Sequence, residues 1–253
     1  MWILKTIAAA FSLFSAVPMP QFPWDKSNMR YMLCAFPLVG ALIGGLCWGW
    51  QSLCGTLALP ALMKGLGMCL IPFLVTGGIH LDGFCDTWDA LASHGTAQKK
   101  QEILKDPHMG AFAGAHLGFL LLTLFVLWTV LPAYRPLPVL FSFVLSRSLS
   151  ALAVTSFPLR EGSGLARSFA ETSDRNRVRI FSLLLSLAAG TAICVTGGGI
   201  MVPAALLVFL WYRYVLTRQF EGISGDLAGW FLQQAELFML IALYAGEIAE
   251  GLR

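Results

Sequence analysis

The chain has 253 residues, of which 57% are hydrophobic and only 12% are charged, and its formal net charge is +3. Soluble domains carry roughly twice that share of charged residues. Composition and a mean hydropathy of +0.71 therefore exclude an ordinary soluble domain and predict a polytopic membrane protein in contact with the lipid bilayer. So small a net charge gives no argument for nucleic acid, and we expect no nucleic-acid partner.

The first 20 residues, MWILKTIAAAFSLFSAVPMP, share an early lysine and an apolar stretch with signal peptides. They lack a clear A-x-A cleavage site and lead into further hydrophobic segments, so we expect a retained helix. Residues 2–17 would either span the bilayer or lie at its interface. The six cysteines show no C-x-x-C spacing, and we interpret them as small membrane-buried side chains.

Long apolar runs continue along the rest of the chain, and a helix that crosses the bilayer needs ~20 mostly apolar residues. The sequence predicts an all-α, polytopic integral membrane protein with seven or eight transmembrane or interfacial helices in a single domain, residues 1–253. The expected spans are 31–53, 65–79, 111–131, 138–158, two within 180–212 divided by the glycines and proline of 196–203, and 227–245.

Lysine and arginine are distributed unevenly between the two sets of connecting loops. Twelve lie in segments 18–30, 80–110, 160–179 and 213–226, against three (Lys64, Arg135 and Arg253) in the opposite loops and at the C-terminus. Positive loops face the cytoplasm. The first set of loops is therefore predicted to be cytoplasmic.

The stretch GGIHLDGFCDTWDAL (77–91) places three aspartates in eight residues of this apolar chain. In a helix over 81–91, Asp82, Asp86 and Asp89 share one face. Such a group needs protons or cations for neutralisation, and hard carboxylate oxygens suit Mg²⁺ or Mn²⁺ with a substrate phosphate. The alternative is a solvated helix end with acids near its N-terminus. Gly83 would let a ligand or another helix approach closely.

A second polar segment, KDPHMGAFAG (105–114), precedes the 111–131 span. Lys105 and Asp106 lie there at the mouth of a helix whose N-terminus would favour an anion. His80 adjoins the acidic face as a candidate base or orienting donor, and His108 lies in the second segment. For His94 and His116 the sequence offers no obvious partner.

Two further segments carry polar residues at or near membrane depth. Arg147, in FVLSRSLSAL, would face a phosphate or pair with a buried partner, and both remain open. In 221–238, Gly225 and Asp226 precede Glu236, and ligand contact and helix packing are equally open there.

Taken in order, six segments resemble the cobalamin synthase (adenosylcobinamide-GDP ribazoletransferase) family. GGIHLDGFCDTWDAL is similar to its G-G-x-H-L-D-G-x-x-D-x-x-D signature, and the resemblance covers nearly the whole chain. Ala90, Pro107 and Glu221 depart from the family pattern without removing a carboxylate. The other similar segments are RYMLCAFPLVGALIGG and EILKDPHMGAFAG, then SRSLSAL, REGSGLARSF and GISGDLAGWFLQQAEL.

The resemblance implies an enzyme of the bacterial inner membrane with its active site toward the cytoplasm. Its substrates would be adenosylcobinamide-GDP and α-ribazole or α-ribazole 5′-phosphate, its product GMP beside the cobalamin, and its cofactor Mg²⁺ or Mn²⁺. Whether it forms a homo-oligomer stays open. The implied catalytic residues are Asp82, Asp86, Asp89, Asp106 and His80, the metal ligands Asp82, Asp86, Asp89 and Asp106, with Asp106 alternatively the base, and the substrate-binding residues Lys105, Arg147, Gly83, Gly225 and Asp226.

Two other classes compete with this interpretation. CDP-alcohol phosphotransferases carry D-G-x-x-A-R, but here Asp82-Gly83 is followed by Phe84, Cys85 and Asp86, so the arginine is missing. An ion-coupled transporter would use membrane acids such as Glu236. Most acids of this chain cluster at one predicted edge, and the halves show no repeat, which favours an enzyme.

Overall fold

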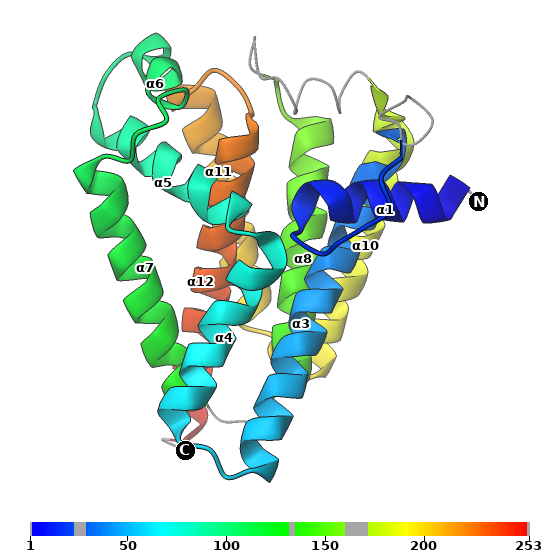
Figure 1. The fold of residues 1–253 in the computed structure, drawn as a ribbon, viewed down its shortest axis with the longest axis vertical. Helices are drawn as coiled ribbons and strands as arrows, with labels where there is room; N and C mark the ends of the chain where they lie inside the picture. Colours follow the sequence, from blue (N-terminus) through cyan, green and yellow to red (C-terminus); the bar gives the residue numbers. More distant parts are fainter. Residues whose placement is uncertain (1, 23–28, 132–134, 160–171, 252–253) are drawn as a thin grey trace.

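The structure, a computed structural model, describes residues 2–22, 29–131, 135–159 and 172–251. These residues form helices and connections, with one isolated parallel bridge between Leu159 and Ile223, so the predicted all-α class is confirmed. Figure 1 shows most helices side by side along one direction. They are α1 (Trp2–Phe14), α3 (Met32–Thr56), α4 (Ala61–Thr76), α5 (Ile79–Ala92), α6 (Ala97–Ile103), α7 (Ala111–Val130), α8 (Pro136–Ser156), α10 (Arg175–Val195), α11 (Met201–Gln219) and α12 (Gly225–Gly251).

Five of these helices, α3, α7, α8, α10 and α12, are long and apolar enough to cross a membrane. The pair α4 and α5 gives a sixth such segment, bent by 94° at its break. The chain is thus a multi-pass membrane protein, as its composition predicts. The 180–212 run divides into two helices as expected, because α10 ends at Val195 and α11 begins at Met201, with Gly197 between them at a φ of +91°. Of the two, α10 meets the criteria for a membrane span and α11 does not.

The structure of α1 distinguishes between the two predictions for residues 2–17, which were to span the bilayer or to lie at its interface. With 13 residues, α1 is about 20 Å long, too short for a hydrocarbon layer of about 30 Å. It lies across α3 in Figure 1, and the side chains of Trp2, Ile3 and Leu4 are exposed. These features are those of an interfacial helix.

Small residues allow close packing inside the bundle, most clearly between α3 and α8. A Cβ atom on Gly40 would lie 2.3 Å from the carbonyl oxygen of Phe143, and one on Gly44 would lie 2.7 Å from the Cα of Leu140. Lipid gives helices little hydrophobic drive to associate, so such close backbone contact is a main source of their attraction.

The end of the bundle that holds the α3–α4 connection and the C-terminus, here called the far end, is tied together by Arg135. Its Nε lies 2.7 Å from Glu247 and its Nη2 lies 2.5 Å from Glu250, both on α12. Its Nη1 also donates to the carbonyl of Gly197 in the α10–α11 connection. One side chain thus joins the start of α8, the end of α12 and the α10–α11 connection.

Candidate active site

The acidic stretch folds as the predicted helix, and two glycines set its direction. Gly77 and Gly78 have φ values of +63° and +82°, a backbone conformation that residues with side chains rarely adopt. The chain can therefore end α4 and turn sharply into α5 at this point. The backbone N–H of Ala16 donates to the carbonyl of Val75 at 2.8 Å, which fastens the end of α1 to the same bend.

The acids of α5 lie at the end of the bundle opposite the far end, together with Asp226 at the start of α12 (Figure 1). Asp82 is exposed, whereas Asp86, Asp89 and Asp226 are half-buried. The negative charges of Asp82, Asp226 and Asp89 all act on Asp86. The sequence placed Asp226 in a separate segment as a substrate contact, and the fold brings it to the aspartates of α5.

Gly83 makes this meeting of α5 and α12 possible. A Cβ atom at Gly83 would lie 2.7 Å from both the Cα and the carbonyl oxygen of Asp226. A Cβ atom on Gly229, which follows Asp226 by about one turn of α12, would lie 3.0 Å from the carbonyl oxygen of His80. Of the two readings for Gly83, close approach of a helix is the one observed. Gly83 is buried, and its predicted contact with substrate stays a prediction.

Asp89 has a structural role that the sequence did not indicate. Its Oδ2 accepts the backbone N–H of Gly110 at 2.5 Å, and its Oδ1 accepts that of Ala113 at 2.8 Å. The carboxylate thereby satisfies two N–H groups at the start of α7, where the helix dipole also favours negative charge. The 105–114 segment does bind an anion at its helix N-terminus, but that anion is Asp89.

Asp106 and Lys105 lie on the exposed connection before α7. The Asp106 carboxylate accepts hydrogen bonds from the ring and backbone N–H of His108, at 2.7 and 3.0 Å, and the side-chain bond holds its pKa below the usual range. Asp106 is therefore engaged with a neighbour in the chain. Within the described ranges, no three His, Cys, Asp or Glu side chains are grouped closely enough to hold a metal ion. Magnesium binding stays a prediction.

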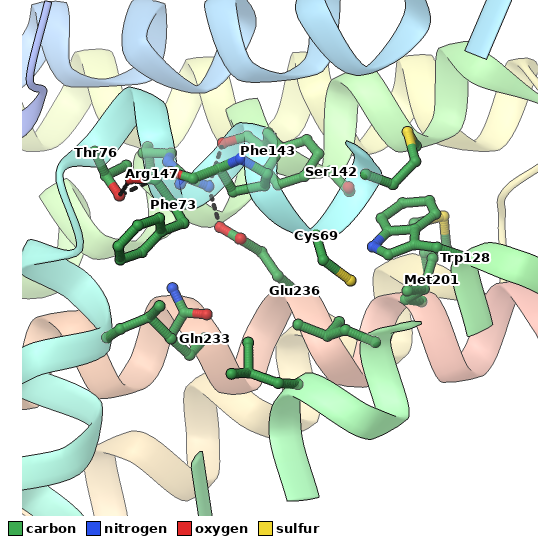
Figure 2. A pocket seen from close by; sticks show the side chains of 16 residues that line it. Cys69, Phe73, Thr76, Trp128, Ser142, Phe143, Arg147, Met201, Gln233 and Glu236 are labelled. Atoms are coloured by element: carbon green, nitrogen blue, oxygen red, sulfur yellow. Dashed lines mark hydrogen bonds and ion pairs between the residues drawn. The ribbon is translucent and has the colours of Figure 1, made fainter. Parts of the chain in front are cut away.

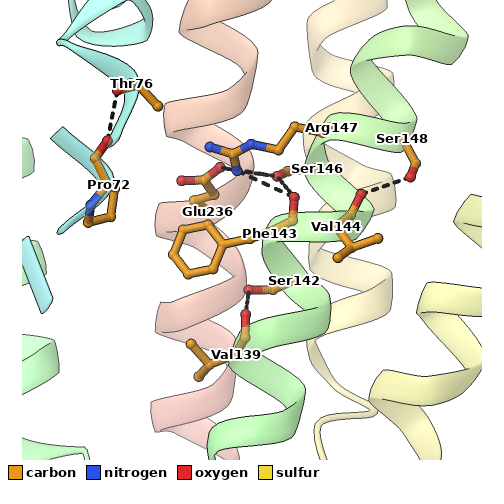
Figure 3. A network of polar contacts seen from close by, with 10 residues as sticks. All are labelled: Pro72, Thr76, Val139, Ser142, Phe143, Val144, Ser146, Arg147, Ser148 and Glu236. Atoms are coloured by element: carbon orange, nitrogen blue, oxygen red, sulfur yellow. Dashed lines mark hydrogen bonds and ion pairs between the residues drawn. The ribbon is translucent and has the colours of Figure 1, made fainter. Parts of the chain in front are cut away.

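Arg147 is fully buried and forms an ion pair with Glu236 of α12 (Figure 3). Its Nη1 also donates to the Ser146 hydroxyl at 2.9 Å. Both charged groups line a cavity of about 40 Å³ between α4, α7, α8 and α12, where Figure 2 shows Thr76 and Gln233 nearby. Of the two roles left open for Arg147, this is the buried-partner role. Its predicted contact with phosphate stays a prediction.

The loop before α12 positions Gly225 and Asp226. Ile223 pairs with the 158–159 segment through a 2.9 Å bond from its N–H to the carbonyl of Pro158. Ser224 then caps the helix, because its hydroxyl accepts the N–H of Leu227 at 3.3 Å. Glu221 adopts a φ of +60°. The family resemblance of residues 160–169 lies outside the described residues.

A second cavity, of about 150 Å³, opens beside the acids. Helices α1, α3, α5, α8 and α12 contribute its walls, which are mostly apolar. Asp82 and Asp226 lie at this cavity, and so does His80, whose side chain is 6% exposed. The histidine predicted as a catalytic base is thus a buried wall residue. We call this space the α1–α12 cavity.

An aromatic cluster near the acids was missed in the sequence. The ring of His116 stacks on Trp88 with centroids 3.8 Å apart and planes 13° apart, and Trp88 meets Trp230 edge-on at 6.2 Å. The sequence offered one signal, a histidine inside an otherwise apolar span. Periodicity alone could not supply its partner, which lies on another helix.

Comparison with known proteins agrees with the order of the motifs. The cobalamin-5-phosphate synthase family model matches residues 6–244. Proteins named adenosylcobinamide-GDP ribazoletransferase are similar along nearly their full length. The one from Lachnoclostridium phytofermentans is 37% identical over 98% of this chain and 95% of its own. The one from Geobacillus kaustophilus is 33% identical over 93% and 91%. No solved structure matches the chain. This chain belongs to the cobalamin-5-phosphate synthase family.

Proposed function

We propose that this chain joins adenosylcobinamide-GDP to α-ribazole, or to its 5′-phosphate, and releases GMP, a step in assembling the nucleotide loop of cobalamin. The family and the names of its relatives support this activity. The observation that carries it is the meeting of Asp82 and Asp86 on α5 with Asp226 on α12, across Gly83 and beside a cavity. Family membership also decides against the CDP-alcohol phosphotransferase and transporter alternatives.

The reaction is an exchange at phosphorus. A ribose hydroxyl oxygen forms a bond to the phosphorus on the cobinamide arm, while the bond from that phosphorus to the bridging oxygen breaks. GMP leaves with the bonding electrons, and the hydroxyl proton goes to a carboxylate base. The acidic side chains and the diphosphate are both anionic, so the carboxylates alone would repel the substrate.

A divalent cation would resolve that repulsion. The oxygen donors of Asp82, Asp86 and Asp226 are of the type that Mg²⁺ and Mn²⁺ prefer. In the described structure the three side chains are not grouped closely enough to hold one ion, so they would have to move together when metal and diphosphate bind. When bound, such an ion would neutralise the charge that develops on the diphosphate. This set differs from the four ligands predicted from sequence, because Asp89 holds the start of α7 and Asp106 is bonded to His108 on the exposed connection.

We also propose that the acidic end faces the cytoplasm of a bacterial inner membrane. Nine of the twelve loop cations lie among the described residues at or near the acidic end: Arg30, Lys99, Lys100, Lys105, Arg175, Arg177, Arg179, Arg213 and Arg218. Lys64 and Arg135 lie toward the far end. This asymmetry follows the positive-inside rule and would place the acids where nucleotides and magnesium are available.

The test is release of GMP by purified protein given adenosylcobinamide-GDP and α-ribazole. Asp86→Asn keeps the shape of the side chain but removes its charge, so we expect at least a hundredfold loss of kcat, roughly the effect of removing one electrostatic contact to a transition state. Glu102→Gln is the matched control, because Glu102 is exposed on α6 and forms a surface ion pair with Lys99. Full activity in Asp86→Asn would overturn the site, and CMP release from a CDP-alcohol donor would overturn the reaction.

A further inference from the structure

The walls of the α1–α12 cavity are suited to binding a flat apolar group. Its walls carry few polar side chains, and two aromatic rings, Phe14 of α1 and Phe36 of α3, pack with centroids 4.2 Å apart. The apolar wall residues include Leu13, Phe14, Leu33, Phe36, Val154 and Leu232. Asp82 and Asp226 also line it, so a molecule held there reaches the acids.

One polar atom in this wall lacks a partner among the described residues. The Nε2 of His80 is buried and makes no hydrogen bond there, although the ring is only 6% exposed and packs 5.8 Å from Phe36. Leaving a buried ring nitrogen unpaired costs free energy, and native proteins rarely do so without a ligand or water to satisfy it. Its position in the cavity wall points to a ligand.

We infer that the α1–α12 cavity binds the aromatic base of the ribazole, with the Nε2–H of His80 donating to the base nitrogen that is not bonded to ribose. This inference rests on the proposed function. A benzimidazole base presents two apolar edges and a single acceptor nitrogen, which matches the mostly apolar walls and the unpaired Nε2 of His80. Guanine carries several donors and acceptors, and these walls would leave most of them unpaired.

This assignment also orients the nucleoside. With its base against Phe14, Phe36 and His80, the attached ribose lies on the side of the cavity where Asp82 and Asp226 are found. That is where the attacking hydroxyl is needed. The interfacial helix α1 supplies Leu13 and Phe14, so it is part of the acceptor site as well as a membrane contact.

The experiment is a cycle of one substitution and one ligand change. His80→Phe keeps an aromatic ring and removes the donor, and the indole riboside replaces the acceptor nitrogen of the base by carbon. We expect each single change to raise the KM for the nucleoside roughly tenfold, the size of one buried hydrogen bond. Combining both should add little further, and the KM for adenosylcobinamide-GDP should not change.

A second variant tests the cavity by size. Ala228→Leu, on α12 in the cavity wall, should weaken binding of dimethylbenzimidazole riboside more than binding of the smaller imidazole riboside. His116→Phe is the matched control, because it makes the same substitution in a ring stacked on Trp88 and should keep the wild-type KM for nucleoside. The inference fails if His80→Phe instead raises the KM for adenosylcobinamide-GDP. It also fails if the substitution raises the KM for the benzimidazole riboside and for the indole riboside by the same factor. If wild-type protein releases no GMP, the proposed function fails.

Discussion

Three aspartates that look equivalent in the sequence do different work in the fold. Asp82 is exposed beside the cavity, Asp86 receives the charges of its neighbours, and Asp89 accepts two backbone N–H groups of α7. Their i, i+4, i+7 spacing correctly predicts a shared helix. It could not predict that the third would be engaged by a helix N-terminus, since that depends on where residues 110–113 lie in space.

Asp89→Asn separates capping from chemistry. The amide can accept only one of the two N–H groups and turns its own NH₂ toward the other, so we expect about 1–2 kcal/mol lower stability. This corresponds to a fall in Tm of roughly 2–8 °C for the purified protein in detergent. Asp82→Asn should keep the wild-type Tm while losing activity. Equal melting temperatures for the two variants would contradict the capping role.

Arg147 shows a different limit of sequence reasoning. A buried arginine needs a partner or a ligand, and the sequence named both without choosing between them. Glu236 was visible as an intramembrane acid, yet only the packing of α8 against α12 shows that the two form a pair. Removing either Arg147 or Glu236 would leave an uncompensated buried charge and destabilise the protein. An exposed acid is solvated by water and does not need such a partner.

At the scale of elements, the contact between α5 and α12 is what builds the site. The sequence predicted both helices, because apolar runs and a helical acid spacing are local signals. The 94° bend at Gly77 and Gly78 and the fit of Gly83 onto Asp226 are tertiary features. The length of α1 was equally hidden, since apolar residues continue beyond its end at Phe14.

Gly83→Ala should damage this contact directly. The added Cβ would stand 2.7 Å from backbone atoms of Asp226, so the helices must separate, at a cost of about 1–3 kcal/mol. We expect a lower Tm together with loss of GMP release. The matched control for stability is Gly225→Ala, where an added Cβ meets nothing within 4 Å. A Gly83→Ala protein as stable as Gly225→Ala would show that the helices are not held as described.

At the scale of the whole molecule, the described cations lie mainly at the acidic end, and this predicts the orientation of the chain. The C-terminus of α12 is at the far end (Figure 1). Alkaline phosphatase fused after Arg253 should therefore be active in the periplasm, whereas green fluorescent protein at the same place should stay dark.

Truncating the chain after Gln219, at the end of α11, moves the fusion point to the acidic end. The two reporters should then exchange their behaviour. Fluorescence from the full-length fusion would show that the C-terminus is cytoplasmic. The acidic end would then face the periplasm, which contradicts the proposed orientation.

The far end has a consequence for how reactants travel. Arg135 ties α8, α12 and the α10–α11 connection there, whereas the acidic end carries the cavity and the exposed connections. Because the far end is held closed by these contacts, we expect the donor, the nucleoside and the cobalamin product all to enter and leave at the acidic end. We therefore expect turnover to continue unchanged in sealed inverted vesicles, without a gradient across the bilayer.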